Sequence, residues 1–159
     1  MITEENSKID AKAFLERVEK LDKLIANKTA EKEQWERLAQ STTSRLQEDK
    51  VQASGSQSKM GDAVIKYVDL EKEIDGLIDE YINEKRAVIA VIEQLDPVEY
   101  DVLHKKYIQY ETYEDFYDIA AAYKQSYTWA TTTHGRALQQ VRRILEEKRA
   151  EKLKICDVV

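Results

Sequence analysis

Apolar residues recur with helical spacing through the last third of the chain, between Tyr113 and Leu145. One helix face is predicted by four residues at i, i+3, i+4 and i+7: Phe116, Ile119, Ala120 and Tyr123. Ser126 then opens a second helix, whose inward positions are Ala130, Thr133, Ala137, Leu138 and Val141. Helices joined by so short a turn must cross, so the pattern predicts a helix-turn-helix.

A much longer and narrower apolar stripe runs through the first part of the chain. Ser7 and Asp10 have the spacing of a capping box, which predicts that the first helix begins there. The stripe comprises Ile9, Phe14, Val18, Leu21, Ile25, Trp35, Leu38 and Leu46, with a gap at 27–34. A narrow stripe over roughly 40 residues favours a helix of about 60 Å that packs against one partner.

The partner is predicted to be a second long helix that follows a flexible connection at 47–61. That connection is rich in Gly, Ser and Gln and lacks apolar periodicity, and Asp62 is the expected cap of the next helix. Apolar residues then recur from Val64 to Leu95, so we expect an antiparallel, coiled-coil-like hairpin. Gly76 costs this helix about 1 kcal/mol relative to Ala unless a close backbone approach requires it.

Asp96-Pro97 marks the boundary between the hairpin and the helix-turn-helix. Proline suits the first turn of a helix, with Asp96 as its cap. Thr112 and Asp115 have capping-box spacing and are predicted to start the next helix. The predicted fold is therefore all-α, with a hairpin domain at 1–95, a helix-turn-helix domain at 96–150 and a frayed tail at 151–159.

The distribution of charge along the chain is more informative than the net charge. The net charge is −6 with 35% charged residues, which is typical of long-helix proteins. Residues 126–154, however, include seven basic and three acidic residues. The basic residues are Arg136, Arg142, Arg143, Lys148, Arg149, Lys152 and Lys154, and the acidic residues are Glu146, Glu147 and Glu151. The second helix of the motif is therefore a local basic stripe on an acidic chain.

Composition also limits the possible location and chemistry of the protein. No apolar run approaches a membrane span, and residues 1–10 lack the apolar core of a secretory signal, so we expect a cytoplasmic protein. The single Cys156 fits a reducing compartment. Asp101 and His104 form only one carboxylate–histidine pair, whereas a di-metal bundle site needs two. Without a phosphate loop or a nucleophile motif, we expect neither an enzyme nor a cofactor or metal.

The residues of the last third carry a family resemblance. A proline-started helix, Ile119-Ala120, Ser126 and the run 136–138 (Arg-Ala-Leu) resemble region 4 of sigma-70-type factors. Together with the string HGRAL at 134–138 and the lead-in IDGLIDEYINEKRAVIAVIEQL, the chain more closely resembles small phage and prophage proteins of Gram-positive bacteria. Many of these are described as late-gene transcriptional regulators of the ArpU or RinA type. That family usually has a glycine where this chain has Lys124.

The resemblance implies a DNA-binding transcriptional regulator whose recognition helix, 126–145, enters the major groove. The candidates for facing base edges are Ser126, Tyr127, Thr128, Trp129, Thr131, Thr132 and His134. The candidates for phosphate contacts are Lys124, Arg136, Arg142 and Arg143. Neutralising three to five phosphates would give a log–log salt slope of roughly −3 to −5.

Two other functions fit the same pattern. A small terminase subunit also joins a helix-turn-helix to oligomerising helices, but it marks DNA for packaging and forms rings. A helix-turn-helix can instead serve as a protein-interaction module without DNA binding, and the weak recognition face at 127–129 favours that alternative. For the regulator we expect double-stranded DNA, a homodimer formed through the hairpin and a contact with host RNA polymerase as partners, and no membrane.

Overall fold

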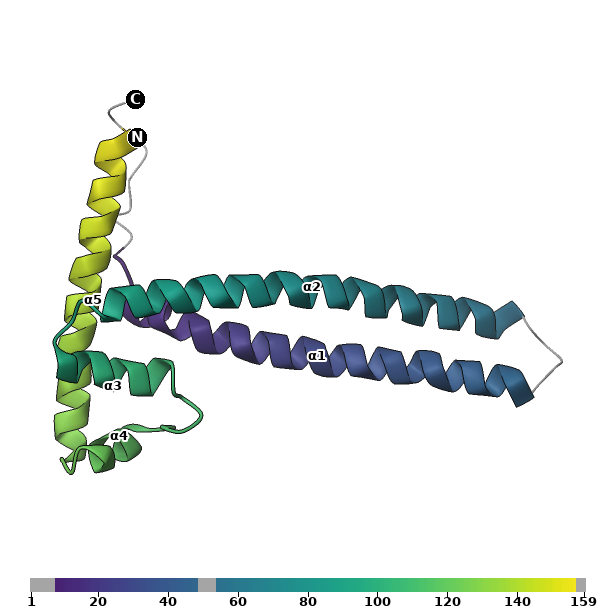
Figure 1. Ribbon diagram of the computed structural model, residues 1–159, viewed down its shortest axis with the longest axis horizontal. Helices are drawn as coiled ribbons and strands as arrows, with labels where there is room; N and C mark the ends of the chain where they lie inside the picture. The colour runs from purple at the N-terminus through teal and green to yellow at the C-terminus, as the bar shows by residue number, and fades with distance from the viewer. Residues whose placement is uncertain (1–7, 49–53, 157–159) are drawn as a thin grey trace. The chain divides into compact units, whose positions relative to one another are not determined.

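The computed structural model describes residues 8–48 and 54–156, which form five helices and no strand. The helices are α1 (Ala11–Glu48), α2 (Ser54–Ile92), α3 (Pro97–Tyr107), α4 (Phe116–Ala122) and α5 (Tyr127–Cys156) (Figure 1). The all-α class is thereby confirmed. The chain divides into two compact units, a smaller unit of Lys20–Ile82 and a larger unit of Met1–Glu19 with Asn83–Val159. This division falls inside α1 and α2, whereas the sequence placed its boundary at 95/96.

The helices extend further than the sequence indicated. The predicted flexible connection at 47–61 is helical at 47–48 and 54–61, and only 49–53 lie outside the described residues. Asp62 therefore lies inside α2 and does not cap it. The predicted frayed tail is also wrong at 151–156, because α5 continues to Cys156. Both stretches lack proline, and residues 151–154 of the tail are Glu, Lys, Leu and Lys, which have high helix propensity, so nothing there stops a helix that has begun.

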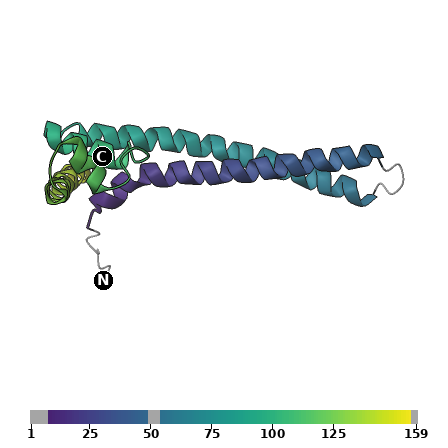
Figure 2. The same ribbon diagram turned by 90° about the horizontal axis from the view of Figure 1, so that it is seen from below.

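In the smaller unit α1 and α2 lie side by side and run in opposite directions (Figures 1 and 2). Lys28 pairs with Glu73 at 2.6 Å, and Lys32 pairs with Glu71 at 3.2 Å. The Lys32 ammonium also lies 4.9 Å from the centre of the Tyr67 ring. These lysines occupy the gap at 27–34 in the apolar stripe of α1. Ion pairs and a cation–π contact thus continue the helix pairing where apolar side chains are missing.

The larger unit holds most of the buried apolar side chains. The predicted inward residues Ala130, Thr133, Ala137 and Val141 of α5 are buried, whereas Leu138 is only half-buried. They share the core with Leu15 and Val18 of α1, Val88, Val91 and Ile92 of α2, Val102, Leu103 and Tyr107 of α3, and Ile119 and Ala120 of α4. The small alanines on α5 allow α3 and α4 to approach its axis closely.

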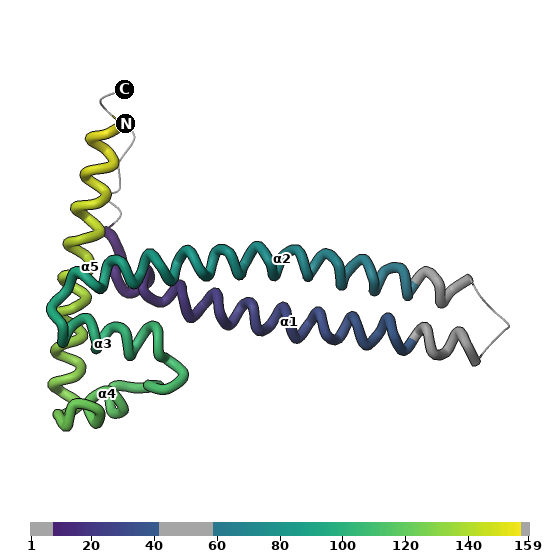
Figure 3. The backbone as a smooth tube through the Cα atoms, viewed as in Figure 1, coloured from purple at the N-terminus to yellow at the C-terminus, as the bar shows by residue number. Residues whose placement is uncertain are grey.

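A short turn joins α4 to α5 (Figure 3), and backbone hydrogen bonds close it. The N–H of Gln125 donates to the carbonyl of Ala120 at 2.9 Å, and the N–H of Lys124 donates to the carbonyl of Ala121 at 3.1 Å. This pair of bonds is a Schellman motif, which places the residue after the helix cap in the left-handed region. Lys124 occupies that position with φ of 53°. The structure thus confirms that Lys124 has the backbone conformation for which glycine is preferred.

The predicted and observed helix caps agree only in part. The hydroxyl of Ser126 accepts from the N–H of Trp129 at 3.1 Å, so Ser126 caps α5 as predicted. The cap of α4 is Asp115, paired reciprocally with Asp118, and not the predicted Thr112. Asp96 stands at the cap position of α3 without a side-chain hydrogen bond. At the first cap, Asp10 accepts from the N–H of Ala13 at 3.0 Å, and Ser7 lies outside the described residues.

Replacing Lys124 by glycine should stabilise the protein, because glycine adopts a positive φ without the clash that an L side chain suffers. We expect Lys124→Gly to raise the free energy of unfolding by about 1 kcal/mol in urea denaturation. Lys148→Gly provides the control, since Lys148 lies in the interior of α5 and glycine there should cost about 1 kcal/mol. Equal destabilisation by both variants would contradict the left-handed turn.

Candidate nucleic-acid interface

The side of α5 opposite its buried stripe is a continuous, exposed polar surface, which we call the outer face. Helical periodicity and exposure assign six residues to it: Thr128, Thr132, Gly135, Arg136, Gln139 and Arg143. A Cβ added at Gly135 would meet no atom within 4 Å, so the face is open at its centre. Hydroxyl, amide and guanidinium groups are those that hydrogen-bond to base edges and phosphates.

Gln139 belongs to the outer face but was missed by the sequence reasoning, which stopped its list of candidates for facing bases at His134. The signal was available, because 128, 132, 135 and 139 repeat at spacings of four, three and four residues. That is the complement of the inward stripe on the same helix. A glutamine amide can donate and accept at once, which is the pattern that adenine presents in the major groove.

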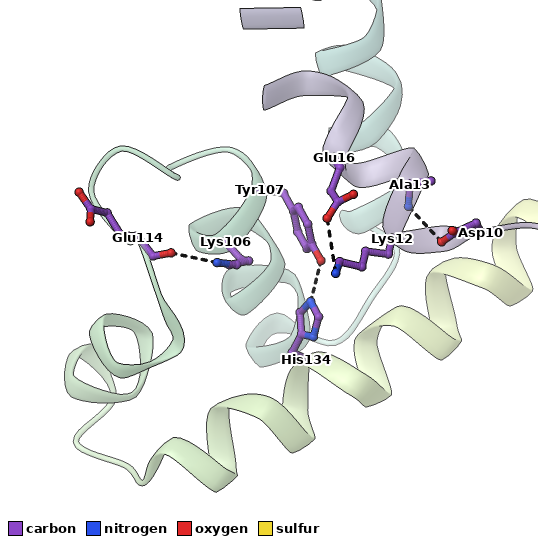
Figure 4. Close-up of polar contacts among 8 residues, drawn as sticks. All are labelled: Asp10, Lys12, Ala13, Glu16, Lys106, Tyr107, Glu114 and His134. Atoms are coloured by element: carbon purple, nitrogen blue, oxygen red, sulfur yellow. Dashed lines mark hydrogen bonds and ion pairs between the residues drawn. The ribbon is translucent and has the colours of Figure 1, made fainter. Parts of the chain in front are cut away.

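His134, which the sequence placed among the base-facing residues, lies in the interface between α5 and α3. Its Nε2 is 2.7 Å from the hydroxyl of Tyr107 (Figure 4), and its ring also meets Phe116 edge-on with centroids 4.8 Å apart. Burial, together with the positive charges of Lys106 and Lys12, lowers the pKa of His134 to about 4. Burial also raises the pKa of Tyr107. Both rings are therefore neutral at pH 7, and the hydroxyl can donate to Nε2.

Three other predicted base contacts have partners within the protein. The ring of Tyr127 lies 4.4 Å from that of Tyr117, and the ring of Trp129 lies 4.9 Å from that of Tyr123. The hydroxyl of Thr131 donates to the carbonyls of Tyr127 and Thr128, at 3.3 and 3.1 Å. These side chains flank the outer face and tie α5 to α4 and to its own first turn. Of the residues expected to meet bases, Thr128 and Thr132 remain on the open face.

The arginines at the middle of α5 are partly committed to other groups. Nε of Arg142 donates to the carbonyl of Ile9 at 3.3 Å and lies 3.9 Å from Glu146. Arg143 lies 3.9 Å from Glu147 but is 67% exposed, so its guanidinium is still accessible. Arg136 is exposed, and no acidic side chain among the described residues pairs with it. Arg136 is thus the most available cation on the outer face.

A polar cluster behind the turn fixes the approach of α4 to α3. Asp101 accepts hydrogen bonds from the Lys105 ammonium, at 2.7 and 2.8 Å, and from the hydroxyl of Tyr123. Burial acts to raise the pKa of Asp101, but the hydrogen bonds from Lys105 and Tyr123 hold it below its usual value. Asp101 is therefore a structural anion that holds the residue just before Lys124. The ring of His104, three residues after Asp101, lies 5.6 Å from that of Tyr100.

Two further features bear on the chemistry of the described residues. In residues 8–48 and 54–156, no group of three His, Cys, Asp or Glu side chains is arranged to hold a metal ion. Within the same residues, none of the helices combines the length and apolar character needed to cross a membrane.

Comparisons with protein-family models, with curated proteins and with solved structures give no match.

The burial of His134 predicts a specific pH dependence of stability. Its pKa in the folded state, about 4, lies below the ordinary 6.5, so its contribution is complete above pH 6.5 and is lost as the pH falls toward 4. We expect the urea concentration at the unfolding midpoint to decrease as the pH is lowered from 7 to 4.5. His134→Gln should make that decrease smaller. His104→Gln is the control, because it removes the other histidine and keeps His134, so the decrease in the urea midpoint should stay. An unchanged fall in His134→Gln would contradict the buried, neutral histidine.

Proposed function

We propose that the larger unit is a helix-turn-helix of the sigma region 4 type that binds double-stranded DNA, and that the protein is a phage or prophage transcriptional regulator. The observation that carries the proposal is the outer face of α5, which is polar and open. It follows directly after a short turn that joins α5 to α4. The proposed phage or prophage origin of the protein rests on the sequence resemblance described above.

The proposed docking places the first turns of α5 in the major groove, where an α-helix fits between the phosphate backbones. Thr128 and Thr132 then face base edges, where a threonine hydroxyl pairs with several bases and its methyl group contacts thymine. Gln139 is suited to adenine, and Arg136 to guanine or to a phosphate. A face with two threonines predicts modest sequence specificity.

The phosphate contacts are fewer than the sequence alone indicated. Arg142 is held by the carbonyl of Ile9 and by Glu146, so it is a weak candidate for a phosphate. Lys124 in the turn, Arg136 and Arg143 are exposed and remain. Three neutralised phosphates give a log–log salt slope of about −3, the shallow end of the range expected from the sequence.

The smaller unit is proposed to pair two copies of the chain through its antiparallel helices. Its buried apolar core is thin, consisting of Ala63, Leu70 and Ile74 among the residues whose burial the structure describes. Four apolar residues of α2 stay 38–42% exposed, in two pairs with a spacing of four residues: Val64 with Val68, and Ile78 with Ile82. A second copy packed on these residues would bury them, and the resemblance adds host RNA polymerase as a further protein partner.

Two alternatives are kept because they predict different observations. A small terminase subunit should form a ring of many copies, whereas a regulator should have a mass near once or twice 18.5 kDa in solution. A protein-interaction module without DNA binding is favoured by the carboxylates beside the motif. Glu146 and Glu147 offset the charge of the neighbouring arginines, and Asp115 occupies the first N–H groups of α4.

Reversing one charge on the outer face tests the DNA-binding surface. We expect Arg136→Glu to weaken binding to a duplex from upstream of the neighbouring operon by roughly tenfold or more, and to reduce the salt slope by about 1. Fluorescence anisotropy of the labelled duplex against salt concentration measures both. Lys152→Glu is the matched control, because it makes the same charge change on the same helix about 24 Å further along the axis.

Equal weakening by the two variants would mean that binding follows net charge and not the outer face. No binding of the wild-type chain at low salt would contradict the proposed function and leave the protein-interaction module in its place.

A further inference from the structure

An exposed aromatic pair lies at the start of α4 and α5. Tyr117 is 66% exposed and Tyr127 is 44% exposed, and their ring centroids are 4.4 Å apart. Phe116 meets Tyr127 edge-on at 6.3 Å and supports the pair from the protein side. Exposed tyrosines in contact with each other offer a large and rigid contact area at little cost in side-chain entropy, and tyrosine is enriched among the residues that dominate protein interfaces.

The segment at the start of α4 is acidic, although Lys124 precedes Tyr127 by three residues and the Lys106 ammonium lies 5.1 Å from the centre of the Phe116 ring. The segment 110–118 reads YETYEDFYD and carries four carboxylates: Glu111, Glu114, Asp115 and Asp118. All four residues are exposed. Asp115 and Asp118 cap α4, which uses their oxygens in part. Glu114 precedes Tyr117 by three residues in the sequence, and Asp118 follows it directly.

Rings of this segment already hold lysines of the same unit. The Lys105 ammonium lies 5.3 Å from the centre of the Tyr113 ring, and the Lys106 ammonium lies 5.1 Å from that of Phe116. Lys106 also donates to the carbonyl of Glu114 at 3.0 Å (Figure 4). The described structure thus contains the contacts that an incoming cation would make: an aromatic face with an oxygen acceptor beside it.

The aromatic pair is separate from the outer face of α5. Tyr127 lies on the flank of α5 that carries His134, whereas Thr128 and Thr132 lie on the opposite side from the core. The carboxylate of Asp115 accepts from the N–H groups of Tyr117 and Asp118, at 2.7 and 3.1 Å. The start of α4 therefore has its own anion and repels a phosphate. DNA is a poor occupant for this surface, and a cationic protein segment is a good one.

We propose that Tyr117 and Tyr127, with the carboxylates of Glu114 and Asp118, form a docking surface for a protein segment that presents lysine or arginine. The two exposed rings supply the apolar contact and the cation–π faces, and the carboxylates select positive charge. The surface does not depend on DNA binding, so it serves a regulator and a protein-interaction module equally. In a regulator it would leave the outer face of α5 free for DNA while a partner is bound.

The test uses the full chain and a fluorescein-labelled, Ala- and Leu-based helical peptide with four lysines, compared with the same peptide carrying four glutamates. Anisotropy should show binding of the lysine peptide at least about tenfold tighter than that of the glutamate peptide. Tyr117→Ser should weaken lysine-peptide binding by about fivefold, and it leaves the fold intact because the ring is mostly exposed. The pair Glu114→Gln with Asp118→Asn should weaken it as well, and asparagine retains an oxygen for the cap.

The matched control is the pair Glu93→Gln with Glu151→Gln, which removes the same charge from exposed positions elsewhere in the larger unit. We expect this control to bind the lysine peptide as the wild type does. Equal weakening by both charge pairs, or no effect of Tyr117→Ser, would overturn the docking surface.

Titration of Tyr117→Ser with duplex DNA separates this inference from the proposed function. Wild-type DNA affinity in that variant, together with lost peptide binding, supports two separate surfaces. Loss of DNA affinity in Tyr117→Ser would assign the pair to the DNA interface and overturn the inference while supporting DNA binding. Peptide binding by a chain that binds no DNA would support the inference and contradict the proposed function.

Discussion

The packing of the inner stripe of α5 against α3 and α4 is the constraint on which the rest of the larger unit depends. Ala130, Ala137 and Val141 are fully buried, and they fix the rotation of α5 about its own axis. Because a helix has one orientation once its buried stripe is set, Thr128, Thr132 and Gln139 must face outward. The left-handed turn at Lys124 then sets where α5 begins relative to α4. The candidate DNA face and the aromatic surface both follow from these two local facts.

Charge is arranged around this frame in two different ways. Along α5, Arg142 and Arg143 each lie close to a glutamate four residues on, so Arg136 is the most available cation of the outer face. Around the start of α4 the carboxylates are not matched by any basic residue of the 110–118 segment. A protein with a net charge of −6 can therefore present one face to an anionic partner and another to a cationic one.

The sequence predicted the inward residues of α4 and α5 well, because small and apolar residues at helical spacing have few other uses. The family resemblance also drew attention to Lys124, because that family usually has a glycine there and the φ of Lys124 is 53°. The sequence did not predict the ring contacts of His134 and Tyr127, which it placed among the base-facing residues. Only the folded structure shows that the hydroxyl of Tyr107 contacts the His134 ring and that the ring of Tyr117 lies against that of Tyr127. The sequence also predicted a flexible connection at 47–61, where 47–48 belong to α1 and 54–61 to α2. Serine and glycine lower the helix propensity of such a segment but do not exclude a helix.

The most direct test of the account is an NMR titration of the full-length, ¹⁵N-labelled chain with duplex DNA from upstream of the neighbouring operon. The account predicts that the largest amide shift changes fall on Thr128, Thr132, Arg136 and Gln139, while Tyr117 and His134 stay unchanged. Changes centred on Tyr117 and α4, or no change at low salt, would contradict the assignment of the outer face of α5 as the DNA-binding surface.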